Sequence, residues 1–472
     1  MMTLLSTDTI AAVATPPGEG GIAVVRVSGP EALKVAASVF RSYAGGEVGK
    51  GKGYSVRYGR FVEAATGEVT DDGLLTIFRA PHSYTGENSV ELSCHGGRAT
   101  TAWVLQLTLS AGARLAGPGE FTQRAFLNGK LDLAQAEAVA DVIRARTESA
   151  RRQARRQLEG ALSDVIGEMR NELIGILAAI EVTIDFSEEV GDLDYALLET
   201  RIHVVCERVG RLLATVGRGR VLREGLHVAL VGRPNVGKSS LLNALLRSDR
   251  AIVTPVAGTT RDTLEETATL AGLAVVLTDT AGIRETGDVV EQLGVRRAQE
   301  AAGRADVALL VLDAAEGVTS ADRSVAAQLT ASEAAPLLIV LNKCDALPEE
   351  RLPALRAQVL SGFSVGPPQV LTVSAQTGAG LEALEAALVR PYLPTEADSE
   401  ESVVITAARH AQALESARQA LDHALQTTRD GLPGDFIAID VRGALDALGE
   451  ITGETVTEEI VHRIFQDFCV GK

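Results

Sequence analysis

The spacing of hydrophobic positions changes along the chain and divides it into segments. Residues 1 to about 127 alternate short β-rich runs, such as residues 21–27 and 73–78, with glycine-rich turns, which is typical of an α+β domain. From about residue 131, hydrophobic positions recur at steps of three and four. This period predicts a long amphipathic helix along Leu158, Leu162, Val165, Met169, Leu173, Leu177 and Ile180.

Residues 223–392 have a different pattern, in which apolar runs alternate with helical stretches. The runs that we expect to be strands are residues 227–231, 274–278, 307–312, 337–341 and 370–373. Strands separated by helices favour a mostly parallel, doubly wound sheet.

An acidic, proline-containing connector follows at residues 391–402, and then the helical period returns. Its apolar positions are Leu414, Ala417, Leu421, Ala424 and Leu425. We therefore expect an α/β domain inserted into a helical one, with segments 1–127, 128–222, 223–392 and 393–472. The two helical flanks are expected to pack as one domain; two independent bundles are the alternative.

Composition and charge limit the possible functions. The 472 residues carry a formal net charge of −17, so any contact with RNA must come from a local basic patch or from a partner. The four cysteines have neither the spacing of metal ligands nor a disulfide framework. With no signal peptide and no run of about 18 apolar residues, we expect a cytoplasmic protein without a membrane span.

A phosphate-binding motif stands between an apolar strand and a helix. Gly232-Arg-Pro-Asn-Val-Gly-Lys-Ser239 has the G-x-x-x-x-G-K-S pattern in the strand–loop–helix context of a P-loop. Backbone N–H groups of such a loop surround phosphate oxygens, and Lys238 supplies a positive charge to the β- and γ-phosphates. The hydroxyl of Ser239 is suited to Mg²⁺.

Three further motifs follow in the order found in Ras-like GTPases. Asp279-Thr-Ala-Gly282 ends one predicted strand, Asn342-Lys-Cys-Asp345 ends another, and Ser374-Ala-Gln-Thr-Gly follows the last. Asp345 can accept both the N1–H and the amino group of guanine, which adenine does not offer. The motifs predict GTP binding by Gly232, Asn235, Val236, Gly237, Lys238, Ser239, Ser240, Thr254, Thr259, Thr260, Asp279, Thr280, Ala281, Gly282, Asn342, Lys343, Asp345, Ser374 and Ala375.

Hydrolysis needs a group that orients water, and the usual glutamine is missing. The position after the DxxG motif is Ile283, so another polar residue must serve, and the following segment offers Glu285, Asp288 and Glu291. In the switch loop, Thr260 is the preferred Mg²⁺ ligand, with Thr259 as the alternative. An arginine finger or a monovalent cation could stabilise the transition state, and the residues alone leave both open.

The chain resembles the MnmE (TrmE) family of tRNA modification GTPases along essentially its full length. The resemblance is carried by the blocks at residues 8–18 and 21–29, by Tyr84-Thr-Gly-Glu-Asn-Ser-Val-Glu91, by the run from Pro118 to Ala138, and by the ending Phe468-Cys-Val-Gly-Lys472. The GTPase domain also lies between helical segments, as in that family. We therefore expect an α+β N-terminal folate-binding domain, a helical domain and an inserted Ras-like doubly wound GTPase domain.

The resemblance implies a function. Such proteins form homodimers and act with an FAD-dependent partner, MnmG, in a heterotetramer or larger complex. Together they add a carboxymethylaminomethyl or aminomethyl group to C5 of the wobble uridine of certain tRNAs. The one-carbon unit comes from 5-formyl- or methylene-tetrahydrofolate, and K⁺ stimulates a GTP hydrolysis that is coupled to dimerisation of the GTPase domains.

The resemblance also implies roles for particular residues. Glu291 matches the catalytic glutamate that activates water, and Ser239 and Thr260 match the Mg²⁺ ligands. The K⁺ site corresponds to Asn235, Thr254, Val256 and Thr259, where the cation replaces an arginine finger. The folate-contacting positions correspond to Arg26, Glu91, Lys130 and Lys472. The family suggests a role for Cys469, but packing beside Phe468 would explain it equally well.

Two alternatives remain at this level. A basic stretch at residues 144–156 could contact the tRNA backbone or could be a solvated helix face. A switch-type GTPase that assists ribosome assembly would carry the same GTPase motifs, but it would lack the folate-type blocks and the Cys-x-Gly-Lys ending.

Overall fold

The structure, a computed structural model, describes residues 8–50, 53–248, 265–279, 301–331, 336–362, 369–393, 403–466 and 468–472. The chain forms two compact units. The first comprises Met1–Arg144, Ala154–Val209 and Ala413–Lys472, and the second comprises Ala145–Gln153 and Gly210–Gln412.

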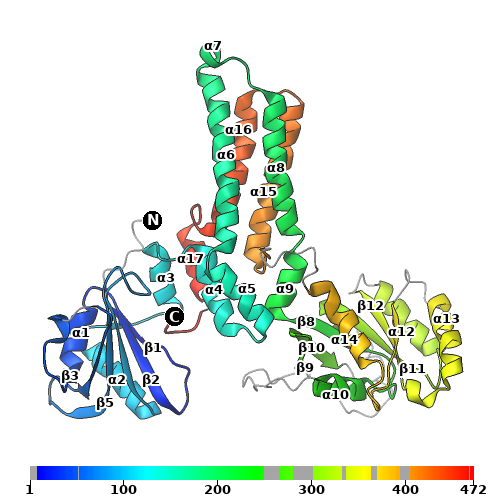
Figure 1. Ribbon diagram of the computed structural model, residues 1–472, viewed down its shortest axis with the longest axis horizontal. Coiled ribbons are helices and arrows are strands. Elements are labelled where there is room, and N and C mark those ends of the chain that lie inside the picture. The colour runs from blue at the N-terminus through cyan, green and yellow to red at the C-terminus, as the bar shows by residue number, and fades with distance from the viewer. Residues whose placement is uncertain are drawn as a thin grey trace. The chain divides into compact units, whose positions relative to one another are not determined.

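A seven-stranded sheet forms the N-terminal part of the first unit, in the order β3-β4-β5-β6-β2-β1-β7 (Figure 1). Its strands are β1 (Ile10–Val13), β2 (Gly20–Ser28), β3 (Phe40–Ser42), β4 (Ser55–Val62), β5 (Val69–Phe78), β6 (Ser89–Gly96) and β7 (Arg114–Leu115). Neighbouring strands are antiparallel except β1 and β7, which are parallel.

The two faces of this sheet have different coverings. Helices α1 (Ala32–Val39) and α2 (Arg98–Ser110) bury one face in a core that includes Phe61 and Leu92. On the other face, Ile10 and Ala12 pack against Phe121 of α3 (Glu120–Leu127). Because Ala12 and Arg26 are cross-strand partners, Arg26 projects from this second face.

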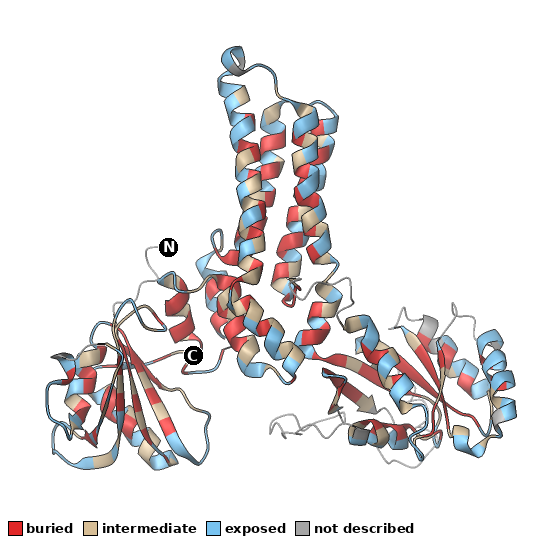
Figure 2. Ribbon diagram, in the orientation of Figure 1, coloured by how far each residue is buried: buried red, intermediate tan, exposed pale blue. Residues whose placement is uncertain are grey.

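The helical part of the first unit is built from two segments that lie before and after the α/β domain in the sequence. Its elements are α4 (Leu133–Arg144), α5 (Glu148–Leu158), α6 (Ala161–Asp185), α7 (Ser187–Val190), α8 (Tyr195–Leu213), α15 (Ala408–Arg429), α16 (Gly434–Thr452) and α17 (Glu458–Gln466). The start of α5, the end of α8 and the start of α15 belong to the second unit. Arg170 of α6 donates to the carbonyl of Leu445 of α16 at 2.8 Å. Figure 2 shows buried residues along the inner faces of these helices, so the two helical flanks share one core.

The long predicted helix differs in two details from the hydrophobic pattern. It begins at Ala161, because Leu158 ends α5 and the chain turns at residues 159–160. Ile166, rather than Val165, is fully buried. In the second flank, all five predicted apolar positions from Leu414 to Leu425 are buried.

The second unit contains a six-stranded sheet in the order β13-β12-β11-β8-β10-β9. Its strands are β8 (Leu226–Val231), β9 (Glu265–Leu270), β10 (Leu273–Asp279), β11 (Val307–Asp313), β12 (Leu337–Asn342) and β13 (Val370–Thr372). Its helices are α9 (Val216–Glu224), α10 (Lys238–Ser248), α12 (Ser320–Ala331), α13 (Leu352–Gly362) and α14 (Leu381–Val389).

Helices cover both faces of this sheet. Val228 and Leu230 of β8 belong to a core shared with α10 and α14, whereas Ala229 and Val231 face the side of α12. Strands β10, β8, β11, β12 and β13 are parallel. The hydrophobic pattern missed β9, a polar edge strand that pairs antiparallel with β10. Its two-residue turn, Ala271–Gly272, has positive φ at both positions, as in a tight hairpin.

The predicted fold class is confirmed: an α+β domain, a helical domain and a doubly wound α/β domain inserted into it. Among the residues that the structure describes, no helix is long and apolar enough to cross a membrane.

Candidate functional site

The P-loop runs from the end of β8 to the start of α10, as its motif predicts. Gly237 has a φ of +94°, and a Cβ on it would lie 2.3 Å from the amide nitrogen of Asn342, so only glycine fits here. The ammonium group of Lys238 is buried inside the loop, where it donates to the carbonyls of Gly232 at 2.7 Å and Arg233 at 2.8 Å. Ser239 and Ser240 lie in the first turn of α10 with exposed side chains.

Asn342 joins the P-loop to the loop that follows β13. Its side chain is only 1% exposed. Its Nδ2 donates to the carbonyl of Val236 at 3.0 Å, and its Oδ1 accepts from the backbone N–H of Ala375 at 3.1 Å. One buried amide therefore sets the distance between two loops that lie 139 positions apart (236 to 375) in the sequence.

Lys343 makes a second connection to the P-loop. Its ammonium group donates to the carbonyl of Asn235 at 2.8 Å and to Asp313 at 2.7 Å. Burial raises the pKa of Asp313, but hydrogen bonds from Lys343 and the Ala315 N–H outweigh it and hold the pKa below its ordinary value. Asp313 therefore stays ionised and fixes Lys343. Sequence reasoning missed this residue, although its place at the end of an apolar strand was a signal.

The two motifs that we expect to contact guanine follow the carboxyl ends of β12 and β13. Asp345 lies in a short 3₁₀ helix, Cys344–Ala346, with its side chain exposed. Ser374 is fully buried, and its hydroxyl accepts from the N–H of Thr377 at 3.1 Å. This arrangement leaves the carboxylate of Asp345 accessible beside a loop that starts at a buried serine.

Several predicted residues lie outside the described part of the chain. They are Thr254, Val256, Thr259, Thr260, Thr280, Ala281, Gly282 and Glu291. Only the backbone of Asp279 is described; it ends β10 and pairs in register with Leu230 of β8.

A second group of predicted residues meets on the N-terminal sheet. Arg26 of β2 lies directly opposite Glu91 of β6, and its Nε donates to a Glu91 carboxylate oxygen at 3.0 Å. The guanidinium lies 5.6 Å from the ring centre of Tyr84 and 5.7 Å from that of Phe121. These contacts place the Arg26 guanidinium, paired with Glu91, near two aromatic rings, one of them on α3.

The C-terminal tail returns to this pair. Val470 forms a β-bridge with Pro118, and Arg26 Nη1 donates to the carbonyl of Gly471 at 3.3 Å. Gly471 has a φ of +95°. Burial and the charge of Arg26 lower the pKa of Lys472, while Glu91 opposes them. Lys472 thus lies close to two residues that are more than 380 positions away in the chain.

Lys130 lies beside the loop that carries Tyr84. Its ammonium group donates to the carbonyl of Pro81 at 3.3 Å, and its stem passes Gly86. The structure therefore brings Arg26, Glu91 and Lys472 together, and it places Lys130 along the adjoining loop. Sequence reasoning did not single out Tyr84 or Phe121, because nothing in the local pattern shows which aromatic rings will meet an arginine.

Arg124 of α3 anchors the loop that carries Tyr84, because it pairs with Glu87 of that loop. This arginine is 5% exposed and reaches Asp8 at 2.6 Å, Glu87 at 3.3 Å and Glu120 at 3.2 Å. Glu87 also accepts from the hydroxyl of Ser28 at 2.8 Å.

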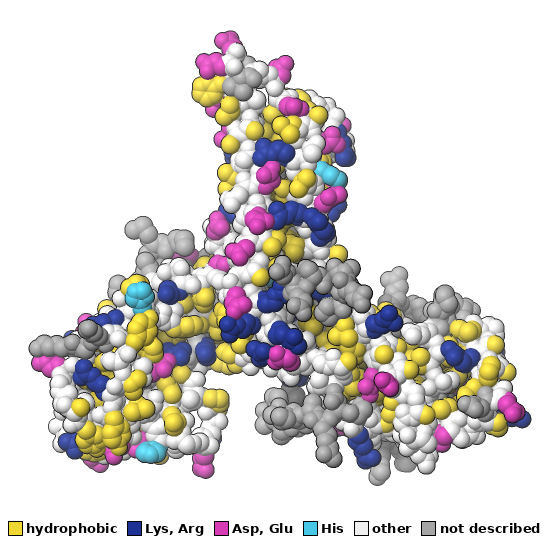
Figure 3. Space-filling model, viewed as in Figure 1, with side chains coloured by type: hydrophobic (Ala, Val, Ile, Leu, Met, Phe, Trp, Pro, Cys, Tyr) yellow, Lys and Arg dark blue, Asp and Glu magenta, His cyan; other side chains and the backbone are white. Residues whose placement is uncertain are grey.

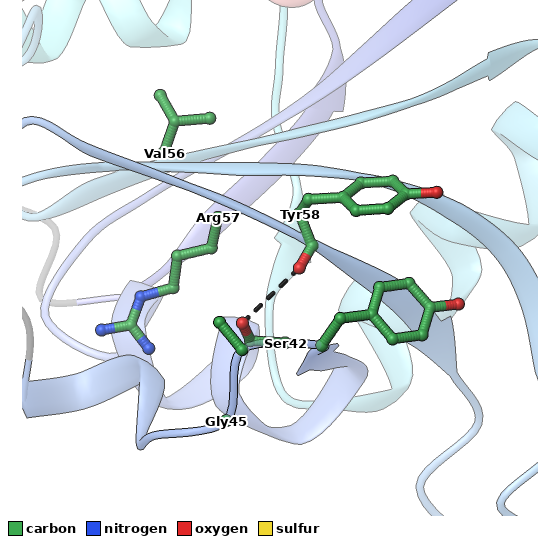
Figure 4. Close-up of a pocket in the computed structure, with 7 residues that line it drawn as sticks. Ser42, Gly45, Val56, Arg57 and Tyr58 are labelled. Atoms are coloured by element: carbon green, nitrogen blue, oxygen red, sulfur yellow. Dashed lines mark hydrogen bonds between the residues drawn. The ribbon is translucent and has the colours of Figure 1, made fainter.

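Two other features lie apart from these groups. A pocket at the β3–β4 edge is lined by residues 42–45 and 56–58 (Figure 4). Strand β5 separates it from β6 and the Arg26–Glu91 pair, and it contains no predicted site residue. In the basic stretch, Arg151 and Arg155 pair with Glu148 and Glu159, both at 2.7 Å, which offsets part of its positive charge.

Comparison with known proteins covers the whole chain. A family model described as the GTP-binding protein TrmE N-terminus matches residues 9–130, and one described as the MnmE helical domain matches residues 133–469. The chain is 48% identical over 466 residues to a protein named tRNA modification GTPase MnmE from Moorella thermoacetica, covering 98% of this chain and 99% of that one.

Two other relatives with the same name are also similar over nearly their full length. The Symbiobacterium thermophilum protein is 47% identical over 98% of this chain and 99% of its own, and the Lactiplantibacillus plantarum protein is 42% identical over 100% of both. A crystal structure of Aquifex aeolicus Era bound to GDP·AlF₄⁻ is 30% identical over 41% of this chain and 66% of that chain, with a TM-score of 0.29. The identity over nearly complete chains means that this protein belongs to the MnmE (TrmE) family of tRNA modification GTPases.

Proposed function

We propose that this protein is the GTP-hydrolysing subunit of a system that modifies C5 of the wobble uridine in certain tRNAs. The added group would be carboxymethylaminomethyl or aminomethyl. The observation that carries the proposal is the match of the complete chain to proteins named tRNA modification GTPase MnmE. A switch-type GTPase for ribosome assembly is not favoured, because the match includes the N-terminal domain and the C-terminal ending.

The test is nucleoside analysis of tRNA from cells that lack this protein. The C5-modified wobble uridine should disappear, and it should return when the wild-type gene is restored. A gene that encodes the Lys238→Ala variant, which lacks the positive charge of the P-loop, should not restore the modified uridine. Normal modification in the deleted strain would overturn the proposal.

The nucleotide loops support a specific division of labour in GTP binding. Lys238 would leave its two loop carbonyls for the β- and γ-phosphates, and Asp345 would accept from the guanine edge. Asn342 would hold the phosphate and base loops at a constant separation. When bound, Mg²⁺ would be held by Ser239 and Thr260 and would offset charge on the β- and γ-phosphate oxygens.

For hydrolysis we propose that Glu291 orients the attacking water, because Ile283 cannot. A K⁺ site formed by Asn235, Thr254, Val256 and Thr259 would supply the positive charge of an arginine finger when two GTPase domains face each other. One feature of Asn235 supports this proposal. Its backbone carbonyl already accepts from Lys343, so its side-chain carbonyl is the group that we propose for K⁺. The residue is exposed and has a φ of +67°. Replacing K⁺ with Na⁺ should slow GTP turnover strongly, and equal rates would contradict the K⁺ site.

For the one-carbon donor we propose a 5-formyl- or methylene-tetrahydrofolate site at Arg26, Glu91, Lys130 and Lys472. The chemistry of these residues fits such a ligand. A carboxylate can accept from the N–H groups of a pterin, and the cations suit the glutamate tail. The aromatic rings of Tyr84 and Phe121 add flat apolar surface beside the charged pair.

The proposed partners are a second copy of this chain, the FAD-dependent protein MnmG and tRNA, in the cytoplasm. The basic stretch is the proposed contact for the tRNA backbone. Arg152 and Arg155 are exposed on α5, so their reversal to glutamate should lower tRNA affinity without disturbing the core. Unchanged affinity would remove this contact from the proposal.

A further inference from the structure

The end of the helical bundle around α7 has an unusual surface. We define the bundle tip as residues 180–199 and 429–442, which lie in the first unit. Tyr195 of α8 donates through its hydroxyl to the carbonyl of Leu432 at 3.1 Å. A Cβ on Gly434 would lie 3.0 Å from Ile180 and 3.4 Å from Ile184. The two segments therefore form one continuous surface.

Large apolar side chains are exposed on this surface. The exposed fractions are 54% for Phe186, 57% for Leu197, 57% for Phe436 and 66% for Ile439. Phe436 and Ile439 are one helical turn apart on α16, so they point in similar directions. Single exposed apolar residues are ordinary, but several at one end of a bundle, two of them one helical turn apart, are typical of a docking surface.

Negative charge surrounds these side chains. Residues 180–199 contain seven Asp or Glu and no Lys or Arg, and residues 429–442 contain three Asp or Glu and two Arg. This net charge of −8 is nearly half of the −17 of the whole chain. Figure 3 shows acidic side chains beside hydrophobic ones around α7, at the top of the view.

The two arginines are already used within the tip. Arg429 pairs with Glu199 at 2.6 Å, and Arg442 pairs with Glu181 at 2.9 Å. The other eight carboxylates, among them Glu188, Glu189 and Asp192, receive no cation from these two segments. Their field would repel nucleic acid phosphates and would also repel the same surface of a second copy.

We propose that the bundle tip is a docking surface for a protein partner that presents basic residues around an apolar patch. The apolar side chains would supply the buried centre of the interface and the carboxylates its charged rim. The rim would speed association and set the orientation, and it would make binding weaken as salt rises. The candidate occupant is the FAD-dependent partner, so the inference rests on the proposed function in this respect.

The test measures binding of the purified FAD-dependent protein to the complete chain by calorimetry at several salt concentrations. Phe436→Ser together with Ile439→Ser should weaken binding at least tenfold. Both positions are exposed, so the fold should be retained, and thermal unfolding followed by circular dichroism checks this. Glu188→Gln with Glu189→Gln should weaken binding severalfold at low salt and flatten the salt dependence.

A matched control has the same change of charge elsewhere on the bundle. Glu207→Gln with Glu415→Gln neutralises two exposed carboxylates outside the tip, roughly 12 Å from it along α8 and roughly 21 Å from it along α15, at about 1.5 Å of rise per residue. This control should bind like the wild type.

The possible failures can be told apart. If wild-type protein binds the partner and both tip variants bind equally well, the docking surface is wrong while the proposed partner stands. If wild-type protein does not bind the partner, the partner assignment in the proposed function fails, and the occupant with it. If the tip variants change only self-association in sedimentation measurements, the occupant is a second copy and the proposal is overturned.

Discussion

The C-terminal tail offers a sharp test of the proposed folate site. An ideal Cβ on Gly471 would lie 2.3 Å from the carbonyl oxygen of Val13 and 3.0 Å from its carbonyl carbon. The residue also has a φ of +95°. Gly471→Ala therefore introduces both an unfavourable backbone conformation and a collision with backbone atoms of β1.

The control variant separates these two effects. Gly112 of the same domain has a φ of +108°, but a Cβ there would have no atom within 4 Å. Both substitutions should cost about 1–2 kcal/mol through the left-handed conformation. Only Gly471→Ala adds the collision, which is roughly 1 Å closer than an ordinary C···O contact of ~3.3 Å. No side-chain rotation can relieve it, because the atoms that it meets belong to the backbone.

We expect the tail to move rather than β1, because β1 is paired on both sides in the sheet. Moving the tail breaks the hydrogen bond from Arg26 to the Gly471 carbonyl and displaces Lys472. A hydrogen bond to a charged group contributes about 1.5–3 kcal/mol when buried, and Arg26 is partly exposed, so the lower half of that range applies. If this free energy is lost in full from the folate complex, the affinity for folate falls about tenfold to fortyfold, at ~1.4 kcal/mol per factor of ten.

The assay is calorimetric titration of the complete chain with 5-formyl-tetrahydrofolate, with GTP turnover measured in parallel. Gly471→Ala should approach the affinity of a chain that lacks Gly471 and Lys472, while Gly112→Ala keeps wild-type affinity and all variants keep GTP turnover. The reasoning is refuted if Gly471→Ala binds folate as tightly as Gly112→Ala does.

Three further predictions concern other parts of the chain. Glu291→Ala should abolish most GTP turnover but keep GTP binding, and unchanged turnover would remove its catalytic role. Asn342→Ala leaves the Val236 carbonyl and the Ala375 N–H without their buried partner, at about 1–3 kcal/mol each. Affinity for a fluorescent GDP analogue should fall at least tenfold, and equal affinity would show that the bridge does not hold the loops. Burial and the carboxylate of Asp422 raise the pKa of Cys206 to about 11, against about 8.5 in an unfolded chain. The stabilisation from its neutral thiol is therefore fully present below pH 8.5 and lost as the pH rises toward 11. Urea unfolding of the wild type and of Cys206→Ala at pH 8 and 10.5 measures this, and equal losses of stability in both would contradict it.

Local pattern predicted most strands of the α/β domain and the loop between β8 and α10. All five strands expected in the α/β domain occur within one or two residues of their predicted limits. The reason is that buried parallel strands need continuous apolar runs and that a P-loop needs glycine and lysine at set spacings, so both leave a signal in adjacent residues. The edge strand β9 leaves no such signal, because four of its six residues are polar and, among the described residues, only β10 pairs with it.

The contacts between distant segments were decided only by the tertiary structure. Arg26 and Gly471 are 445 positions apart, yet they share a hydrogen bond because β2 and the C-terminal tail meet beside α3. The family resemblance implied that residues near both ends of the chain belong to one site. It did not indicate that Tyr84, Phe121 and the ion pairs of Arg124 lie beside that site. Side-chain packing of this kind depends on register and on the faces of elements far apart in the chain, and no periodicity within a single segment records it.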